Sequence, residues 1–345
     1  MQATRQINMD STRWNEHVED CAEGHVFHRY EWGALLSNVH GHEPVYLKHG
    51  EGIFPLALIR SRLFRTRLIS LPFADYGGPC NADAEAVEQM LFSTERIALK
   101  SKADFVEIRA PGKEHFDILI SKGFVRRDDY FTYLTDLNGG IDTLWKMIGE
   151  VNRSNVRKAE KNGVTLKMAE NAEDLSGFYG LYLETMKKLG SPPHPYEFFQ
   201  NLWELFYPAY VTIPMAMYEG KCIASGVFLL HTHKILYWFG VSTRQHLKLR
   251  PNNFLVWQML RWGSINGYRE FDFGRTREGA GNAFFKRHFG GQFKEMPYFY
   301  KIYKDGAALP QRPENKHDRI STLWAGYMPH FAARRIGPWL KAQIG

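Results

Sequence analysis

The segment NNFLVWQMLRWGSINGYREFDFG, residues 252–274, contains a helix pattern followed at once by a strand pattern. Apolar residues recur at helical spacing through residues 252–266 and predict an amphipathic helix. Gly267 ends that pattern, since glycine adopts the left-handed conformation that closes many helices. Residues 268–273 then alternate as a strand, and Gly274 opens a loop. This unit decides the fold because the chain contains it twice.

The first half of the chain has the same order of patterns. Residues 84–102 predict an amphipathic helix, and residues 105–109 predict the strand after it. Paired strand patterns precede the two helices, in residues 44–73 and 215–241. A short helix and an alternating strand follow each unit, in residues 115–137 and 283–303. Such an internal repeat predicts two similar units, each near one domain in size.

The repeat predicts an α+β fold of two tandem domains, each a mixed sheet flanked by helices. We expect domains over residues 1–139 and 140–305, followed by a basic amphipathic tail over residues 306–345. The tail either docks on the first domain or lies on an anionic membrane. Its apolar and basic residues are Trp324, Met328, Phe331, Arg334, Arg335, Ile336, Trp339, Leu340 and Lys341.

Composition limits the possible classes of protein. The 345 residues are 44% hydrophobic, enough for a large core, and no apolar run approaches the roughly 20 residues of a membrane helix. Cys21, Cys80 and Cys222 are widely spaced, so we expect neither a disulfide nor a zinc site, and a cytoplasmic location. The net charge of +7 predicts an anionic partner: RNA, a phosphorylated cofactor, a nucleotide-linked precursor or a membrane.

The triplet Asp272-Phe273-Gly274 matches the residues that hold magnesium in protein kinases. A kinase also needs an upstream GxGxxG loop and an HRD motif. This chain has neither, and its nearest tripeptide is His28-Arg29-Tyr30. We therefore interpret the triplet as the end of a strand and expect no metal.

A basic helix is predicted between the two repeats, within residues 140–170. Arg153 and Arg157, with Lys158 and Lys161, occupy its last turns. Cations there are typical of a solvated face and are favoured by the helix C-terminal dipole. Arg153 and Arg157 are also candidates for binding an anionic substrate.

Several segments together resemble the Fem family, the FemA/FemB/FemX peptidoglycan bridge aminoacyltransferases. They are RSNVRKAEKNGV (153–164), PNNFLVWQMLRWGSINGYREFDFGR (251–275) and GNAFFKRHFGG (281–291), in this order. Two N-terminal segments, residues 25–47 and 61–83, resemble the Fem-like branch associated with XrtA/PEP-CTERM exopolysaccharide loci.

The resemblance implies two tandem GNAT (N-acetyltransferase-like) domains and transfer of an acyl group to an amine. In the bridge enzymes the donor is aminoacyl-tRNA and the acceptor is a lysine of a peptidoglycan precursor. For this chain we expect an aminoacyl-tRNA or acyl-CoA donor, no tightly bound cofactor, and a lipid- or nucleotide-linked glycan precursor as acceptor. The alternatives are an acyl-CoA-dependent N-acyltransferase and a non-catalytic module that binds tRNA or a nucleotide-linked glycan.

The Phe-Lys pair of the Fem pattern falls on Phe285 and Lys286. Lys286 is the main catalytic candidate, because its ammonium can neutralise an oxyanion or a terminal phosphate, and Phe285 can pack against an adenine. Asp272 is a candidate base and Arg275 a candidate fork for carboxylate or phosphate; both can instead form an internal ion pair. Asn282 belongs to a glycine-rich loop that bends either toward substrate or simply as a turn.

In the first domain the resemblance places Arg29, Asp75, Tyr76 and Gly77 at the acceptor cleft. Aromatic packing at a strand end is the alternative role for these residues.

A GNAT domain that binds coenzyme A holds the pyrophosphate in a glycine-rich loop, which here would lie before the second long helix. Residues 240–254 have no glycine after the first position, which weakens the acyl-CoA alternative.

Overall fold

The computed structural model describes residues 5–6, 10–61, 63–277, 279–304, 309 and 330–344, with side chains from residue 10 onward except those of 330–335. The chain packs as two compact units. The first comprises residues 1–130, 295–314 and 339–345, and the second comprises residues 131–294 and 315–338.

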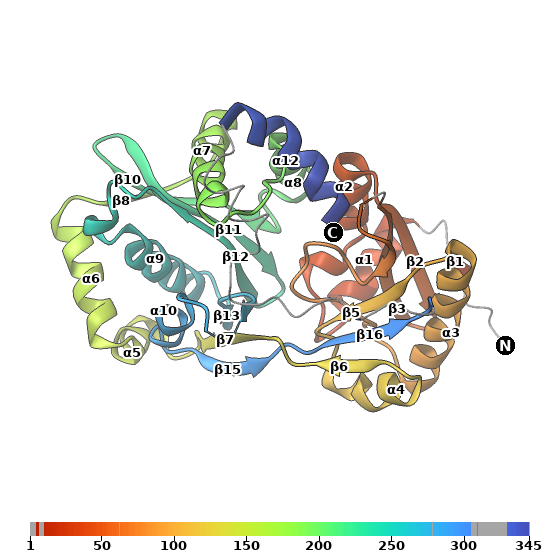
Figure 1. Ribbon diagram of the computed structural model, residues 1–345. Coiled ribbons are helices and arrows are strands. Elements are labelled where there is room, and N and C mark those ends of the chain that lie inside the picture. Colours follow the sequence, from red (N-terminus) through yellow and green to blue (C-terminus); the bar gives the residue numbers. More distant parts are fainter. Residues whose placement is uncertain are drawn as a thin grey trace. The chain divides into compact units, whose positions relative to one another are not determined.

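The first unit contains a mixed sheet with the strand order β1-β2-β3-β4-β5-β16-β6 among the described residues (Figure 1). Among the described strands of this sheet, only β4 and β5 pair in parallel, as expected for strands that are joined by a helical crossover. The strands are β1 (Arg5–Gln6), β2 (Glu43–His49), β3 (Gly52–Arg60), β4 (Thr66–Ile69), β5 (Phe105–Arg109), β6 (Val125–Arg127) and β16 (Tyr298–Ile302).

Helices cover both faces of this sheet because successive strand residues point to opposite sides. The crossover helix α3 (Ala84–Ser101) packs on Val45 and Leu47, whereas α1 (Ser11–Glu19) packs on Tyr46. The other helices are α2 (Tyr30–His40), α4 (Phe116–Ser121) and the 3-10 turns Val26–His28 and Lys113–His115.

The second unit repeats this plan with the order β14-β7-β13-β12-β11-β10-β8; β15 pairs with β7, and β9 with β11. Its parallel pair is β12 and β13, again joined by a helix. The strands are β7 (Tyr130–Asp136), β8 (Thr165–Met168), β9 (Val211–Thr212), β10 (Pro214–Tyr218), β11 (Lys221–His231), β12 (Lys234–Ser242), β13 (Glu270–Asp272), β14 (Thr276–Arg277) and β15 (Gln292–Glu295).

The helix that joins β12 to β13 is α9 (Pro251–Ile265), the helix predicted from the opening segment. Proline occupies its first turn, where no intrahelical N–H partner is lost, and Gly267 follows in the left-handed conformation. Leu255 and Met259 are fully buried, which stabilises the fold by about 2 kcal/mol for each side chain. The other helices are α5 (Gly140–Met147), α6 (Glu150–Lys161), α7 (Ala172–Lys188), α8 (Tyr196–Phe206), α10 (Ala283–Arg287) and the turn Leu247–Leu249.

The two sheets exchange their closing strands. β7 comes from the first repeat of the sequence but pairs with β13, with Phe271 opposite Thr135. β16 comes from the second repeat but pairs with β5 and β6, with Phe299 opposite Ile108. The α+β fold of mixed sheets flanked by helices is confirmed. The predicted domain boundaries, at residues 1–139, 140–305 and 306–345, stay a prediction.

Cys21 and Cys80 form a disulfide across a sequence separation of 59 residues. The expectation of no disulfide was wrong, because Cys80 lies in a backbone bridge to Ile53 that brings it close to the end of α1. Spacing along the sequence does not reveal such a pair. Disulfides are rare in reducing compartments, so the cysteines no longer support a cytoplasmic location.

The third cysteine, Cys222, is a free thiol, and burial raises its pKa to about 12.

The C-terminal helix α12 (His330–Ile344) ends against residues of the first unit. Arg67 donates to the carbonyl of Gln343 at 2.6 Å and also to that of Ile344. His42 Nε2 lies 2.9 Å from the carbonyl of Ala342. These contacts satisfy carbonyls that a helix end leaves without internal partners. Trp324 and Met328 of the predicted tail lie outside the described residues, as do the side chains of Phe331, Arg334 and Arg335.

Acid is expected to destabilise this region. Burial lowers the pKa of His40 to about 3 and that of His42 to about 4, against 6.5 in an unfolded chain. Below pH 6.5 the unfolded chain therefore binds protons that the folded chain excludes, and stability falls until the folded pKa is reached. We expect the free energy of unfolding to drop by about 2 kcal/mol per histidine from pH 7 to pH 5. Urea titrations of the wild type and His42→Phe check this, and equal pH slopes would contradict it.

Among the described residues, no helix combines the length and apolarity that crossing a bilayer requires.

Candidate functional site

A cavity of about 490 Å³ lies in the second unit, among the end of α7, β12, the loop after β13 and α10. It brings together four residues predicted from the sequence: Arg275, Asn282, Phe285 and Lys286. The other lining residues are Thr185, Lys188, Leu189, Tyr237, Trp238, Gly240, Ser242, Asn252, Phe273 and Gly281.

Lys286 is buried on α10 and holds the neighbouring loop. Its Nζ donates to the carbonyl of Gly274 at 2.9 Å, to Thr276 Oγ1 at 2.8 Å and, more weakly, to the carbonyl of Arg275 at 3.4 Å. An ammonium has three N–H donors, so these contacts engage all three. Lys286 therefore places a positive charge in the cavity wall while it fixes the shape of the loop.

Asp272 lies at the end of β13 and is not among the cavity-lining residues. Its side chain is 2% exposed. Oδ1 accepts from the N–H of Gly274 at 2.7 Å and from the hydroxyl of Thr132. Gly274 has a φ of 69°, a left-handed turn that glycine adopts without steric cost. The carboxylate thus stabilises the turn that leads the chain from the strand into the cavity wall.

Among the residues that the structure describes, the lining of the cavity carries positive charge. Lys188, Arg275 and Lys286 line it, and no Asp or Glu belongs to the described lining. Tyr237, Trp238, Phe273 and Phe285 supply aromatic wall. A low-dielectric cavity with cations of one sign stabilises a bound carboxylate or phosphate and an oxyanion formed during acyl transfer.

Tyr237 and Lys188 are candidate functional residues that the sequence reasoning missed. Tyr237 stacks on Phe228, with ring centroids 4.7 Å apart, and burial raises the pKa of its hydroxyl. The phenol therefore stays protonated at neutral pH and can donate a hydrogen bond to a substrate oxygen. The alternation of residues in β12 predicts a strand that contains Tyr237, but nothing in the local sequence indicates that this strand lines a cavity.

Replacing Gly240 with alanine is expected to displace Tyr237. A Cβ at Gly240 would lie 1.9 Å from the Tyr237 hydroxyl, and stacking on Phe228 restrains the ring from moving away. A displacement of about 1 Å in a cavity of this kind lowers kcat/KM about 100-fold. Steady-state acyl transfer measures it, with Gly180→Ala on α7 as the control because its Cβ would meet no atom within 4 Å. Equal rates in the two variants would exclude a role for the Tyr237 position.

The predicted first-domain residues are buried in internal contacts. Arg29 forms ion pairs with Glu19 and Glu31, and Tyr76 stacks on His25 with centroids 4.1 Å apart. Gly77 donates its N–H to the carbonyl of Arg109 at 2.8 Å, and Asp75 is 4% exposed. None of the four predicted residues is among those that line the cavity of the first unit.

Arg153 and Arg157 lie on α6 and are not among the residues lining the 490 Å³ cavity. Arg153 donates to the carbonyls of Ile148 at 2.6 Å and Lys146 at 3.1 Å, so it caps the end of α5. Arg157 is exposed, and its guanidinium lies 5.4 Å from the centre of the Trp145 ring. These contacts fit the solvated, structural alternative for both arginines.

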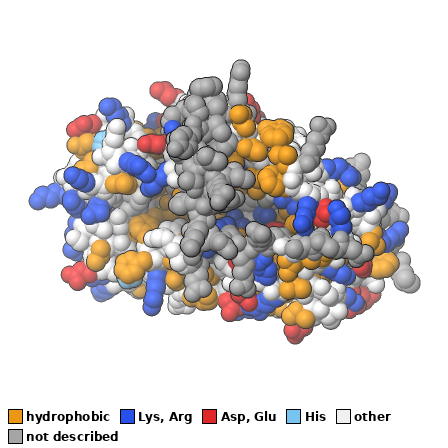
Figure 2. Space-filling model, in the orientation of Figure 1, with side chains coloured by type: hydrophobic (Ala, Val, Ile, Leu, Met, Phe, Trp, Pro, Cys, Tyr) orange, Lys and Arg blue, Asp and Glu red, His pale blue; other side chains and the backbone are white. Residues whose placement is uncertain are grey.

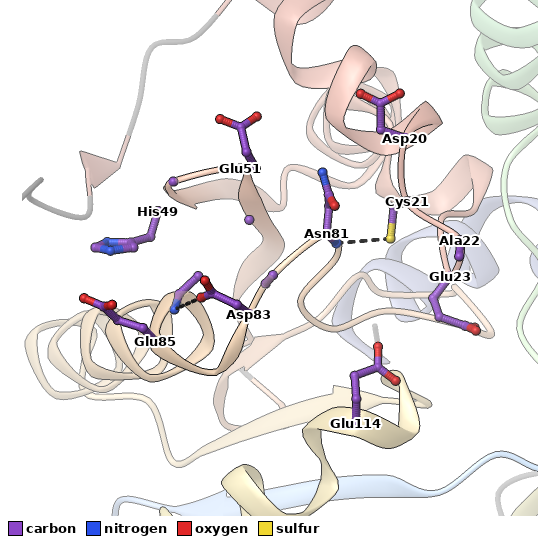
Figure 3. A pocket seen from close by; sticks show the side chains of 14 residues that line it. Asp20, Cys21, Ala22, Glu23, His49, Glu51, Asn81, Asp83, Glu85 and Glu114 are labelled. Atoms are coloured by element: carbon purple, nitrogen blue, oxygen red, sulfur yellow. Dashed lines mark hydrogen bonds between the residues drawn. The ribbon is translucent and has the colours of Figure 1, made fainter.

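A second cavity, of about 760 Å³, lies in the first unit (Figure 3). Carboxylates surround it, and His49 is the one basic side chain of its described lining. The acidic residues are Asp20, Glu23, Glu51, Asp83, Glu85 and Glu114. Asp83 accepts from the N–H of Ala86 at the start of α3, and Glu51 pairs with His17 at 3.2 Å. This negative cavity repels the anionic groups that the second-unit cavity suits, so the second-unit cavity is the candidate functional site.

The fold and this site define a GNAT-like architecture. The family model described as "Acetyltransferase (GNAT) domain" matches residues 150–287, which include α9, the loop after β13 and α10. The match ends directly after Lys286 and Arg287.

Individual relatives agree with that class. A curated protein of Weissella viridescens, UDP-N-acetylmuramoylpentapeptide-lysine N(6)-alanyltransferase, is 24% identical over 122 residues, which are 35% of this chain. The match spans 36% of that protein's length. A crystal structure of FemX is similar with a TM-score of 0.69 and 15% identity over 86% of this chain and 97% of that one. A tandem GNAT protein from the clavulanic acid biosynthesis pathway has a TM-score of 0.56 and 12% identity over 87% and 97%. The tandem GNAT-like fold predicted from the sequence is therefore confirmed.

Proposed function

We propose that the protein is an acyl- or aminoacyltransferase of the Fem type, which acts on an amine of a cell-envelope, peptidoglycan or exopolysaccharide precursor. The observation that carries the proposal is the second-unit cavity, where three cations and an aromatic wall meet and no carboxylate belongs to the lining that the structure describes. The named activity of the Weissella relative and the GNAT match over residues 150–287 support it.

The chemistry follows from the lining residues. A neutral amine attacks the donor carbonyl, and the new C–N bond converts the carbonyl oxygen to an oxyanion. The field of Lys286 and Arg275 and the hydroxyl of Tyr237 stabilise that charge. When the C–O or C–S bond of the donor breaks, the amine proton leaves with the departing alcohol or thiol. This route needs no carboxylate base, and the part of the lining that the structure describes contains none.

The donor in this proposal is aminoacyl-tRNA, with acyl-CoA as the second choice. The turn before α9 carries Arg244, Lys248 and Arg250 in place of the glycine run that holds a pyrophosphate. Phe285 would stack on the terminal base of the donor, and Asn282 would contact it. Arg29, Asp75, Tyr76 and Gly77 would belong to the acceptor side.

The finer expectations belong to this proposal as well. The acceptor is a lipid- or nucleotide-linked glycan precursor, the chain belongs to the XrtA-associated branch, and it works in the cytoplasm at the inner face of an anionic membrane. The resemblance of residues 25–47 and 61–83 supports the branch, and the net charge of +7 supports the anionic partners.

One observation favours a second function. All three N–H donors of Lys286 are engaged within the protein, as in a module that binds a nucleotide-linked glycan or tRNA without turnover. Purified protein incubated with a mixture of aminoacyl-tRNAs, acyl-CoAs and cell-envelope precursors separates the two. A precursor whose mass increases by one acyl group supports the transferase. Binding without any mass increase, across both donor classes, supports the module.

A further inference from the structure

Four large apolar side chains of the second unit are exposed where α5, α6, α10 and β15 meet. Their exposed fractions are 67% for Phe284, 66% for Val151, 61% for Phe293 and 41% for Met147. We call these four residues the apolar face. Soluble monomers seldom gather exposed side chains of this size on neighbouring elements without a partner.

Backbone and ring contacts connect these elements. Gly149, between α5 and α6, donates its N–H to the carbonyl of His288 at 2.8 Å, and the His288 ring packs on Phe284 at 3.8 Å. A Cβ at Gly290 would lie 3.3 Å from Met147. Phe293 packs on Phe131, with centroids 5.2 Å apart. Met147, Val151 and Phe284 therefore lie on elements that contact one another, and Phe293 lies on β15, which begins two residues after Gly290.

Cations outnumber carboxylates on the same elements. Apart from the buried Lys286, α5, α6, α10 and β15 carry seven Lys or Arg that are exposed or half-buried, against four exposed Asp or Glu. Figure 2 shows hydrophobic and basic side chains side by side in the region of α5 and α10. The exposed cations are Lys146, Arg157, Lys158, Lys161 and Arg287. Apolar anchors among lysines and arginines are the chemistry of helices that lie in the headgroup region of an anionic bilayer.

The short helix α10 links this face to the cavity. Phe285 and Lys286 line the cavity, whereas Phe284 and Arg287 on the same helix are exposed. We propose that the apolar face binds the surface of an anionic phospholipid bilayer, with Phe284 and Phe293 entering the headgroup region. The bound protein would then hold its cavity at the interface where a lipid-linked acceptor is found. Val151 and Met147 favour lipid over RNA as the partner, because aliphatic side chains offer no flat face to stack on bases.

The biological role of this membrane binding rests on the proposed function, but the binding itself can be tested without measuring acyl transfer. The full chain is sedimented with vesicles of phosphatidylcholine alone and of phosphatidylcholine with 30% phosphatidylglycerol, at low and high salt. We expect binding to the anionic vesicles that weakens with salt. Phe284→Ser/Phe293→Ser should lower the partition coefficient at least about tenfold. Phe92→Ser is the matched control, since Phe92 is 59% exposed on α3 of the first unit and lies between Glu88 and Glu95.

Three outcomes would overturn the proposal. They are no binding of the wild type to anionic vesicles, an equal loss in the Phe92 variant, and a double variant that binds like the wild type. A wild type that ignores vesicles but binds a CCA-ended RNA hairpin through Phe284 and Phe293 would identify the face as an RNA surface instead. Melting curves of the variants check folding, which exposed side chains should not alter. Acyl transfer without vesicle binding contradicts this proposal alone, and vesicle binding without transfer contradicts only the proposed function.

Discussion

Lys286→Met is expected to lower kcat/KM for acyl transfer about 10²- to 10³-fold. The substitution keeps the length of the side chain but removes the charge that lies in the cavity wall. It also leaves the carbonyl of Gly274 and Thr276 Oγ1 without the ammonium that binds them at 2.9 and 2.8 Å. Steady-state transfer with the donor found in the mass screen measures the effect, and thermal unfolding measures the accompanying loss of stability, about 1–3 kcal/mol.

Thr276→Val separates the charge of Lys286 from its positioning of the loop. Valine removes one partner of the ammonium and one hydrogen bond to Gly274, but it leaves the positive charge in place. If the charge stabilises the oxyanion, this variant should retain most of the activity that Lys286→Met loses. Equal losses would show that Lys286 acts by holding the loop. The neighbouring exposed Arg287→Met serves as the control for loss of charge outside the cavity.

Part of the site is predictable because it is local in sequence. Arg275, Asn282, Phe285 and Lys286 fall within one short stretch after a strand, and the fold brings all four to one cavity. Motif reasoning works in such a case, because a strand end, a glycine turn and a short helix leave few possible arrangements. The engagement of all three Lys286 donors was not predictable, because it depends on the loop conformation that places the Gly274 carbonyl.

The rest of the site comes from distant parts of the chain. Lys188 ends α7 and Tyr237 lies in β12, and neither has a local signal that points to the cavity. The same limit applies to the sheets. Alternation predicts that residues 130–136 and 298–302 form strands, but it does not say which sheet each joins, because partner choice depends on long-range packing. The pairing of Cys21 with Cys80 escaped prediction for this reason too.

The second large effect concerns Asp272, for which the sequence left a base and a structural role open. If the structural role holds, Asp272→Asn should keep within about threefold of wild-type activity, because an amide oxygen can still accept from the N–H of Gly274 and the hydroxyl of Thr132. Asp272→Ala should destabilise the second unit by about 1–3 kcal/mol, since the buried N–H of Gly274 loses its acceptor and the Thr132 hydroxyl keeps only the Gly274 carbonyl. That turn leads into Arg275 and the Lys286 anchor, so activity should fall about 100-fold with it.

The two Asp272 variants distinguish a general base from a structural acceptor, because each role predicts a different activity and stability for the asparagine variant. A general base needs the carboxylate itself, so asparagine would then be as inactive as alanine while remaining as stable as the wild type. A structural acceptor needs only an oxygen at the correct place, so asparagine would be active and stable. Urea unfolding and kcat/KM measured on the same preparations give both readouts. Asp272 is buried, accepts hydrogen bonds from Gly274 in the turn and from Thr132 on β7, and is not among the cavity-lining residues, all of which favours the structural role.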